Sequence, residues 1–178
     1  MELLLIRHAP TPGNLEKRYI GRTDEPIMQP LPVPIPSYPQ VERVYISPML
    51  RCRQTAQLLF GGCKPLILED LRECDFGAFE GKKYAQLCGD SRYRAWIAGE
   101  LDAPPGGESA AAFSLALLCG VRTCCPPVHT RQNRARRIRC ARRHADGDPG
   151  AICKRSGGAK LLCLAGSSLM RMGRKNNI

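Results

Sequence analysis

The sequence contains no Phe, Tyr or Trp after Phe113, although ten of these residues occur up to that point. Acidic residues are almost as scarce there: residues 115–178 contain only Asp146 and Asp148, against 14 Lys and Arg. The formal charge is therefore −1 over residues 1–114 and +12 over residues 115–178. Without aromatic side chains, the C-terminal stretch has little with which to fill a core or to stack on nucleic-acid bases.

Long apolar runs are also missing. No stretch of the sequence approaches the roughly 18 consecutive apolar residues that a membrane-spanning helix needs. The short apolar run at the N-terminus is interrupted by Glu2, and no basic segment precedes it, so it does not resemble a signal peptide. Ten cysteines without such a signal indicate reduced thiols rather than a disulfide framework. We therefore expect a cytoplasmic protein with no membrane partner.

Predicted strands alternate with predicted helices in the first two thirds of the chain. Apolar runs predict strands over residues 3–6, 41–47 and 65–70, and helical spacing predicts helices after Ser47-Pro48, within 84–100 and over 110–118. Ser47 is expected to cap the first of these helices, with Pro48 in its first turn. Five prolines exclude a helix from residues 30–39. The alternation predicts an α/β fold with a parallel sheet.

The same spacing selects the residues expected in the core. On the helix after Pro48 they are Met49, Cys52, Ala56 and Leu59; within residues 84–100 they are Tyr84, Leu87, Tyr93, Trp96 and Ile97. From residue 119 onward no apolar period is recognisable, and only residues 159–170 are typical of a strand and turn. We therefore divide the chain into a folded part, residues 1–114, and a basic, poorly ordered tail, residues 115–178.

Charged side chains follow the predicted strands at the edge where open parallel sheets bind ligands. Arg7 and His8 follow the first strand, and Arg51 lies in the first turns of the helix after the second strand. Glu73 lies in the loop after the third strand. Arginine matches the geometry of phosphate oxygens, and the helix N-terminus adds positive potential. A histidine, two arginines and a carboxylate at one edge are the groups that phosphoryl transfer requires.

Five segments, "LIRHAPTPGN", "IGRTDEP", "ISPMLRCRQTAQLL", "LRECDFGAFEGK" and "PPGGES", resemble in this order the motifs of the histidine phosphatase superfamily. The resemblance covers residues 1 to about 114 and is greatest to the alpha-ribazole phosphatases of cobalamin biosynthesis. It implies a three-layer, phosphoglycerate mutase-like α/β fold with a mostly parallel sheet. It also implies hydrolysis of a small phosphate monoester through a phosphohistidine.

The resemblance assigns roles to six residues: nucleophile His8, general acid Glu73, phosphate ligands Arg7 and Arg51, and pocket residues Asn14 and Thr11. Arg53 and Glu80 are the neighbouring alternatives to Arg51 and Glu73. The resemblance implies no metal and no cofactor, because arginines supply the positive charge.

Members of this superfamily have a second catalytic histidine, in a His-Gly pair after a later apolar strand. In this chain His144 lies at a suitable distance but follows Arg142 and Arg143, and His129 follows two prolines. The apolar segment "LLCLAGSS" has the glycine but no histidine. As written, the chain is therefore expected to lack a core strand and to have weak or no activity.

The change of composition near residue 115 coincides with the end of the resemblance. We interpret residues from about 115 as translated out of the ancestral reading frame. An apolar strand followed by His-Gly in another frame of the coding DNA would support this interpretation, and its absence would refute it.

Two other functions stay open. Cys125, His129, Cys140 and His144 lie near zinc-ligand spacing, and the adjacent arginines could bind nucleic-acid phosphates, although the spacing matches no known zinc-finger pattern well. We therefore do not expect nucleic acid as a partner. A phosphoglycerate mutase would use the same phosphohistidine but return the phosphoryl group to a second hydroxyl. The sequence leaves the oligomeric state open.

Overall fold

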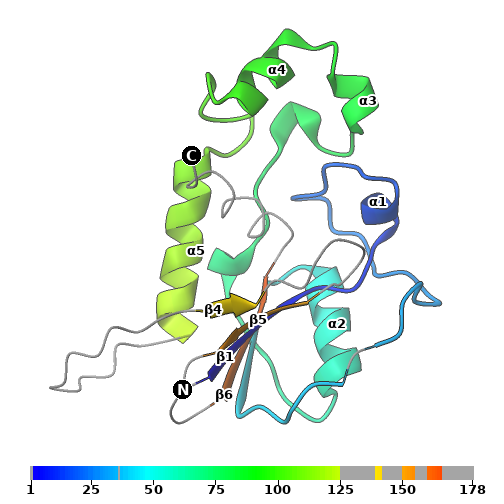
Figure 1. Ribbon diagram of the computed structural model, residues 1–178, viewed down its shortest axis with the longest axis vertical. Coiled ribbons are helices and arrows are strands. Elements are labelled where there is room, and N and C mark those ends of the chain that lie inside the picture. Colours follow the sequence, from blue (N-terminus) through cyan, green and yellow to red (C-terminus); the bar gives the residue numbers. More distant parts are fainter. Residues whose placement is uncertain (1, 36, 125–138, 142–149, 155–159, 166–178) are drawn as a thin grey trace, which may run out of the picture.

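The computed structural model describes residues 2–35, 37–124, 139–141, 150–154 and 160–165 (Figure 1). The strands are β1 (Glu2–Arg7), β2 (Arg43–Ile46), β3 (Leu66–Ile67), β4 (Arg139–Ala141), β5 (Gly150–Lys154) and β6 (Lys160–Ala165). The helices are α1 (Pro12–Leu15), α2 (Leu50–Phe60), α3 (Tyr84–Leu87), α4 (Ser91–Ala98) and α5 (Ala110–Cys124), with 3-10 helices η1 (Glu69–Leu71) and η2 (Gly77–Phe79).

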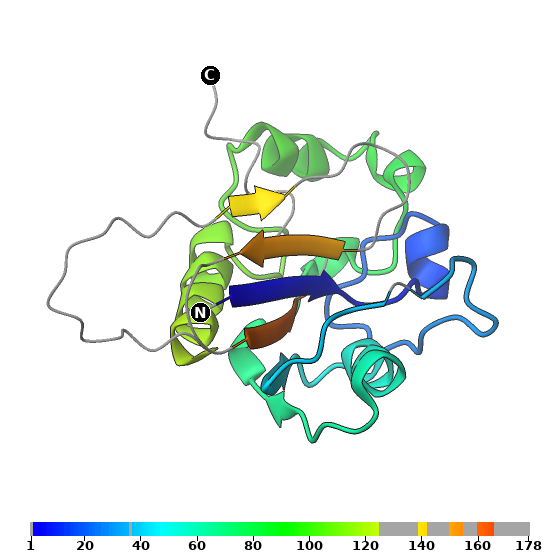
Figure 2. The same cartoon turned by 60° about the horizontal axis from the view of Figure 1, so that its bottom comes forward.

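The strands form one sheet in the order β3-β2-β6-β1-β5-β4 (Figure 2). β6 pairs in parallel with both β1 and β2, and β3 is parallel to β2, whereas β5 pairs antiparallel with β1 on one side and with β4 on the other. The sheet is therefore mostly parallel, as the sequence predicted. The expectation of a missing core strand is wrong, because the apolar run of β6 occupies the position between β1 and β2. A continuous apolar run suits such a central strand.

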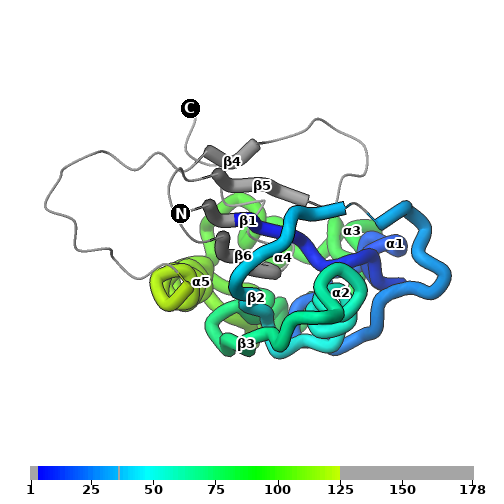
Figure 3. The backbone as a smooth tube through the Cα atoms, turned by 90° about the horizontal axis from the view of Figure 1, so that it is seen from below, coloured from blue at the N-terminus to red at the C-terminus, as the bar shows by residue number. Residues whose placement is uncertain are grey.

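The sheet separates two apolar clusters, which makes the molecule three-layered. One cluster contains Leu4 and Ile6 of β1, Val44 and Ile46 of β2, and Ala56 of α2. The other contains Tyr45 of β2 with Phe113 and Leu117 of α5. Neighbouring residues of β2 thus face opposite sides, as the two-residue period of a strand requires. Viewed along the sheet, α2 and α5 lie on opposite sides of it (Figure 3).

The start of α2 differs from the prediction. The helix begins at Leu50 and its N-cap residue, Met49, makes no side-chain cap, so Ser47 is not the cap. A distant carboxylate takes this role: Asp24 Oδ1 accepts a hydrogen bond of 2.7 Å from the backbone N–H of Leu50. The physical reason is that an unsatisfied N–H of the first turn can be capped from another segment as well as from the preceding residues.

The core prediction is confirmed for Met49, Cys52, Ala56, Leu87 and Tyr93, all of which are buried. Leu59 and Trp96 are partly buried and pack against the two clusters. The prediction is wrong for Tyr84 and Ile97, whose exposed fractions are 67% and 51%. These two lie at the ends of the short helices α3 and α4, and such short helices contain too few turns for the spacing of apolar residues to mark the buried face.

Two boundaries also differ from the expected ones. The third strand is limited to Leu66–Ile67 and continues into η1, whereas residues 65–70 were expected to be extended. Helix α5 continues to Cys124, so the predicted division at residue 114 falls inside a helix. Residues 30–35 and 37–39 form neither helix nor strand, as their prolines predicted. Within the described part of the chain, no helix is long and apolar enough to cross a membrane.

Candidate active site

The candidate site lies at the carboxyl ends of β1 and β2. β1 ends at Arg7, so His8 is the first residue beyond the strand, and Arg51 is the second residue of the helix that follows β2. Because β1 and β2 both run parallel to β6, their carboxyl ends reach the same edge of the sheet. The sequence prediction that His8 and Arg51 share an edge therefore agrees with the topology.

His8 has the features of a neutral nucleophile. Its side chain is 2% exposed, and Nδ1 lies 2.7 Å from the carbonyl oxygen of Ala9. A carbonyl oxygen can only accept, so Nδ1 carries the proton and the lone pair of the neutral ring is on Nε2. Burial lowers the pKa of His8 to about 3; the bond to Ala9 opposes this shift, and the positive charges of Arg51 and Arg7 add to it. The ring is therefore neutral at neutral pH, with a single N–H.

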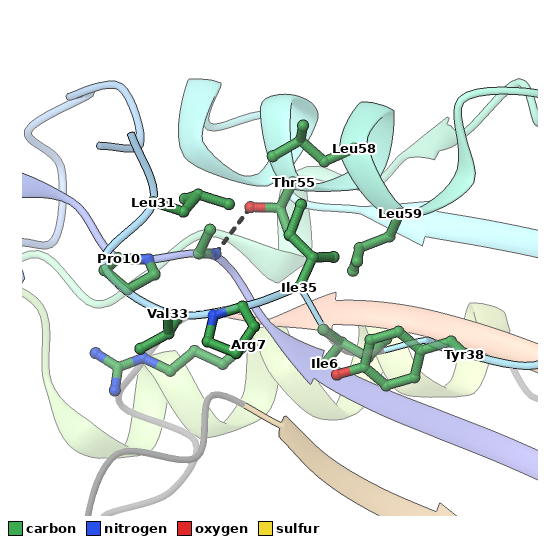
Figure 4. Close-up of a pocket in the computed structure, with 12 residues that line it drawn as sticks. Ile6, Arg7, Pro10, Leu31, Val33, Ile35, Tyr38, Thr55, Leu58 and Leu59 are labelled. Carbon is green, nitrogen blue, oxygen red and sulfur yellow. Dashed lines mark hydrogen bonds between the residues drawn. The ribbon is translucent and has the colours of Figure 1, made fainter. Parts of the chain in front are cut away.

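Thr55 binds the backbone N–H of Ala9, the residue whose carbonyl oxygen contacts His8. The backbone N–H of Ala9 donates to Thr55 Oγ1 at 2.9 Å (Figure 4), and this hydroxyl donates in turn to the carbonyl oxygen of Arg51 at 2.7 Å. One hydroxyl thus joins the loop after β1 to α2. Thr55 lies four residues after Arg51 and so shares its helix face, and this spacing is the signal that the sequence offers for the contact.

Arg51 is buried and fixed by backbone carbonyl groups. Its side chain is 1% exposed and donates from Nη1 to Thr23 O at 2.8 Å and from Nη2 to Gly21 O at 3.0 Å. Arg53, the alternative considered from the sequence, is exposed. Arg7 is partly buried, and its backbone lies opposite Ala165 of β6. The positive charges of both guanidinium groups lower the pKa of His8, so both lie within electrostatic range of its ring.

Glu73 is buried close to the same group of side chains. It is 4% exposed, and its Oε1 accepts from the backbone N–H of Cys74 at 3.2 Å. Burial raises the pKa of the Cys52 thiol to about 11; the Arg51 charge opposes this shift and the Glu73 charge adds to it, so both charged groups lie within electrostatic range of Cys52. Glu73 also lines a cleft of about 470 Å³ together with Gly107 and Glu108 of the "PPGGES" loop.

Thr11 and Asn14 form the capping box of α1. Thr11 Oγ1 accepts from Asn14 N at 3.3 Å, and Asn14 Oδ1 accepts from Thr11 N at 3.4 Å. Such reciprocal bonds satisfy two N–H groups that the helix itself leaves without acceptors. The structure therefore shows a role for both residues in shaping the loop after His8, and their contact with a ligand stays a prediction.

Glu80, the alternative acid, is bound to backbone. Its Oε1 accepts from Gly21 N at 2.7 Å and from Thr23 N at 3.0 Å. Glu80 thus binds the loop that contains Gly21 and Thr23, whereas Glu73 accepts from the neighbouring backbone N–H of Cys74. The sequence analysis missed this contact of Glu80 and the capping bond of Asp24, because each joins residues that are far apart in the chain.

The second histidine of the motif set has no counterpart among the described residues. β6 reaches the candidate edge but ends at Ala165 and contains no histidine. His129 and His144 lie outside the described residues. The same is true of Cys125, so of the suggested zinc ligands only Cys140 of β4 is described. Within the described ranges, no three His, Cys, Asp or Glu side chains are grouped so that they could hold a metal ion.

Comparison with known proteins gives the same family. A sequence profile of the Histidine phosphatase superfamily (branch 1) matches residues 37–115. The "Probable phosphoglycerate mutase GpmB" of Proteus mirabilis is 25% identical over 146 residues, which are 74% of this chain and 66% of that protein.

Two solved structures extend the comparison. The phosphoglycerate mutase of Thermus thermophilus is 32% identical, with a TM-score of 0.53 over 68% of this chain and 71% of that one. The Escherichia coli structure named a "putative alpha-ribazole-5'-P phosphatase" is 25% identical, with a TM-score of 0.58 over 68% and 65%. The chain thus spans just under two thirds of the Proteus and Escherichia proteins.

The sheet order, the edge that holds His8 and these similarities define the class: the chain belongs to the histidine phosphatase superfamily. Members of the superfamily are phosphatases or mutases that act on phosphate esters. The alpha-ribazole phosphatases and phosphoglycerate mutases are the particular relatives to which this chain is similar.

Proposed function

We propose that this chain hydrolyses phosphate monoesters through a phosphohistidine formed at His8. Nε2 of His8 attacks phosphorus, and the bond between phosphorus and the ester oxygen breaks. Glu73 gives its proton to the departing alkoxide. A water molecule then attacks the phosphohistidine and loses a proton to Glu73, which releases inorganic phosphate and restores both side chains.

The observation that carries this proposal is the hydrogen bond between Nδ1 of His8 and the carbonyl oxygen of Ala9. The 2.7 Å bond from Nδ1 to Ala9 O puts the lone pair on Nε2, and burial keeps the ring neutral. An imidazole held in this way is a nucleophile without needing a separate base. Arg7 and Arg51 supply positive charge next to it, and such charge stabilises the oxygens of a phosphoryl group in transfer.

We propose alpha-ribazole 5′-phosphate as the substrate. The support is the wording of the motifs and the 25% identity to the Escherichia coli protein named above. A phosphoglycerate mutase is the second candidate, favoured by the 32% identity to the Thermus thermophilus enzyme. Arg7, Arg51, Asn14 and Thr11 are the proposed binding residues for the phosphoryl group in both cases.

The test compares two reactions on the purified protein. Release of inorganic phosphate from alpha-ribazole 5′-phosphate is measured beside isomerisation of 3-phosphoglycerate. The phosphohistidine is trapped by alkaline denaturation, which preserves the bond between phosphorus and nitrogen, and located by mass spectrometry. We expect phosphate release and a modification at His8. Isomerisation without phosphate release would favour the mutase, and neither reaction would indicate an inactive homologue.

Matched variants assign the residues. We expect His8→Asn to abolish the trapped intermediate and Arg51→Lys to lower kcat/KM by about 100-fold or more, since Lys cannot reproduce the guanidinium fork. Arg53→Lys, on the same helix but exposed, is the control and is expected to leave kcat/KM unchanged. Equal losses for Arg51→Lys and Arg53→Lys, or undiminished turnover in folded His8→Asn, would contradict the assignment.

A further inference from the structure

The short loop Gly21–Thr23 is held from two sides by opposite charges. Glu80 Oε1 accepts from the N–H groups of Gly21 and Thr23 at 2.7 and 3.0 Å. Arg51 donates to the carbonyl oxygens of the same two residues at 3.0 and 2.8 Å. The loop therefore lies between a carboxylate and a guanidinium, and each of them makes two hydrogen bonds to it.

This arrangement fixes Arg51 without neutralising it. A guanidinium has five N–H donors, and two of the hydrogen bonds found here go to uncharged carbonyl groups. Among the described residues, no carboxylate forms an ion pair with Arg51. A carboxylate in direct contact would orient the fork equally well but would offset the charge that a phosphate needs. Placing Glu80 behind the peptide groups keeps the two charges apart.

The loop has little room to move away from this position. A side chain on Gly21 would collide with the carbonyl oxygen of Cys74, so the loop packs directly against the segment that carries Glu73. Glu80 itself is anchored by the bond from its N–H to Gly77 O at 3.1 Å, and the next residue, Gly81, donates to Tyr19 O at 2.7 Å. The second oxygen, Oε2, is buried and has no hydrogen-bond partner among the described atoms. Burial of such an oxygen is unfavourable, so stability alone does not explain the carboxylate.

We propose that Glu80 is a positioning residue of the phosphate site, which acts on Arg51 through the Gly21–Thr23 loop. Glu80 sets the loop so that both carbonyl groups face Arg51, and Arg51 then presents its remaining donors to the phosphoryl oxygens. Glu80 does not touch the substrate. The inference rests on the proposed function, because that function makes Arg51 a phosphate ligand.

The test is a double-mutant cycle of Glu80→Ala and Arg51→Lys, with two measurements on each protein: the Kd for inorganic phosphate by calorimetry and kcat/KM for 4-nitrophenyl phosphate. If Glu80 acts through Arg51, Glu80→Ala weakens phosphate binding by about 30-fold in the wild-type background and by less than about 3-fold beside Arg51→Lys. Glu80→Gln keeps an oxygen that can accept from both N–H groups, so we expect it to stay within about 5-fold of wild type. Glu100→Ala, an exposed carboxylate beyond α4, is the control for loss of charge.

A general loss of structure would give a different result. It would lower phosphate affinity equally in both backgrounds, and this additivity would overturn the inference. An effect of Glu80→Ala no larger than that of Glu100→Ala would overturn it as well. If Glu80→Ala does not fold, Glu80→Asp enters the cycle, because its shorter side chain keeps the charge but cannot reach both N–H groups.

The two proposals fail in distinguishable ways. Coupled losses of phosphate binding in a protein that hydrolyses no monoester would refute the proposed function and support the role of Glu80. Additive losses in a protein that hydrolyses monoesters would refute the role of Glu80 alone. A wild-type protein that does not bind phosphate would refute both.

Discussion

Replacing Thr55 by Val removes the hydroxyl that joins the loop after β1 to α2. Valine has nearly the same shape, so the change removes hydrogen bonds and leaves the packing almost intact. The backbone N–H of Ala9 loses its acceptor at 2.9 Å, and the carbonyl oxygen of Arg51 loses a donor at 2.7 Å. A buried donor without an acceptor costs about 1–3 kcal/mol. For a chain of this length about 2 kcal/mol lowers Tm by roughly 4–8 °C.

The same substitution should also slow formation of the phosphohistidine. The carbonyl group of Ala9 orients the ring of His8, and the N–H of the same residue is held by Thr55, so loss of the Thr55 hydroxyl removes one of the two hydrogen bonds that fix the backbone of Ala9. Thermal unfolding followed by circular dichroism gives the change in stability. Quenched-flow trapping of the intermediate gives the rate, which we expect to fall by about tenfold, equivalent to about 1.4 kcal/mol.

Thr123→Val is the matched control. Thr123 lies near the end of α5, where its exposed hydroxyl donates to Cys119 O at 3.1 Å, the same four-residue bond that Thr55 makes to Arg51. Thr55 additionally accepts from the partly buried N–H of Ala9, whereas Thr123 is exposed to solvent. We therefore expect Thr123→Val to change Tm by less than about 2 °C. If Thr55→Val and Thr123→Val unfold at the same temperature, and both trap the intermediate at the wild-type rate, the reasoning about Ala9 is wrong.

Two further predictions concern charge. His8 has a pKa of about 3 in the folded chain against 6.5 in the unfolded chain, so the unfolded state binds the extra proton between these values. Above pH 6.5 His8 is neutral in both states and contributes no pH dependence; as the pH drops from 6.5 toward 3, the free energy of unfolding falls by up to about 1.4 kcal/mol per pH unit. Urea unfolding at a series of pH values measures this fall, and we expect it to be smaller in His8→Gln. The same pH dependence in both proteins would contradict the pKa. Asp24→Ala removes the acceptor for the N–H of Leu50, so we expect it to lower the free energy of unfolding by about 1 kcal/mol and Tm by roughly 2–4 °C. Asp24→Asn keeps an acceptor and should lose less. Equal Tm values for wild type and Asp24→Ala would show that the cap contributes nothing.

Local patterns in the sequence predicted the elements that carry the candidate site. The apolar run before Arg7 and the helical spacing after Pro48 depend on residues close in the chain, so β1, α2 and their common edge could be predicted. The contact between Asp24 and Leu50 joins residues 26 positions apart, and no local pattern marks it. The same holds for Glu80 and Gly21, which are 59 positions apart. Long-range hydrogen bonds of this kind depend on the finished fold.

The position of β6 shows the same limit on a larger scale. Its apolar residues predicted a strand near residue 160, but the spacing of apolar residues does not say which strands will be its neighbours. The faces of Tyr84 and Ile97 were predicted wrongly because α3 and α4 are too short for a reliable stripe. Sequence reasoning was therefore strongest where several turns of helix or a buried strand repeat one pattern.

The central place of β6 has a consequence for synthesis of the chain. β1 and β2 are both translated early, but the strand that lies between them and pairs with both, β6, begins at Lys160. Until the ribosome has delivered that strand, both early strands expose an unpaired backbone edge, and such edges recruit other chains. Completion of the sheet thus requires a segment that is synthesised late. A nascent or prematurely terminated chain that stops before residue 160 would depend on chaperones to stay out of aggregates.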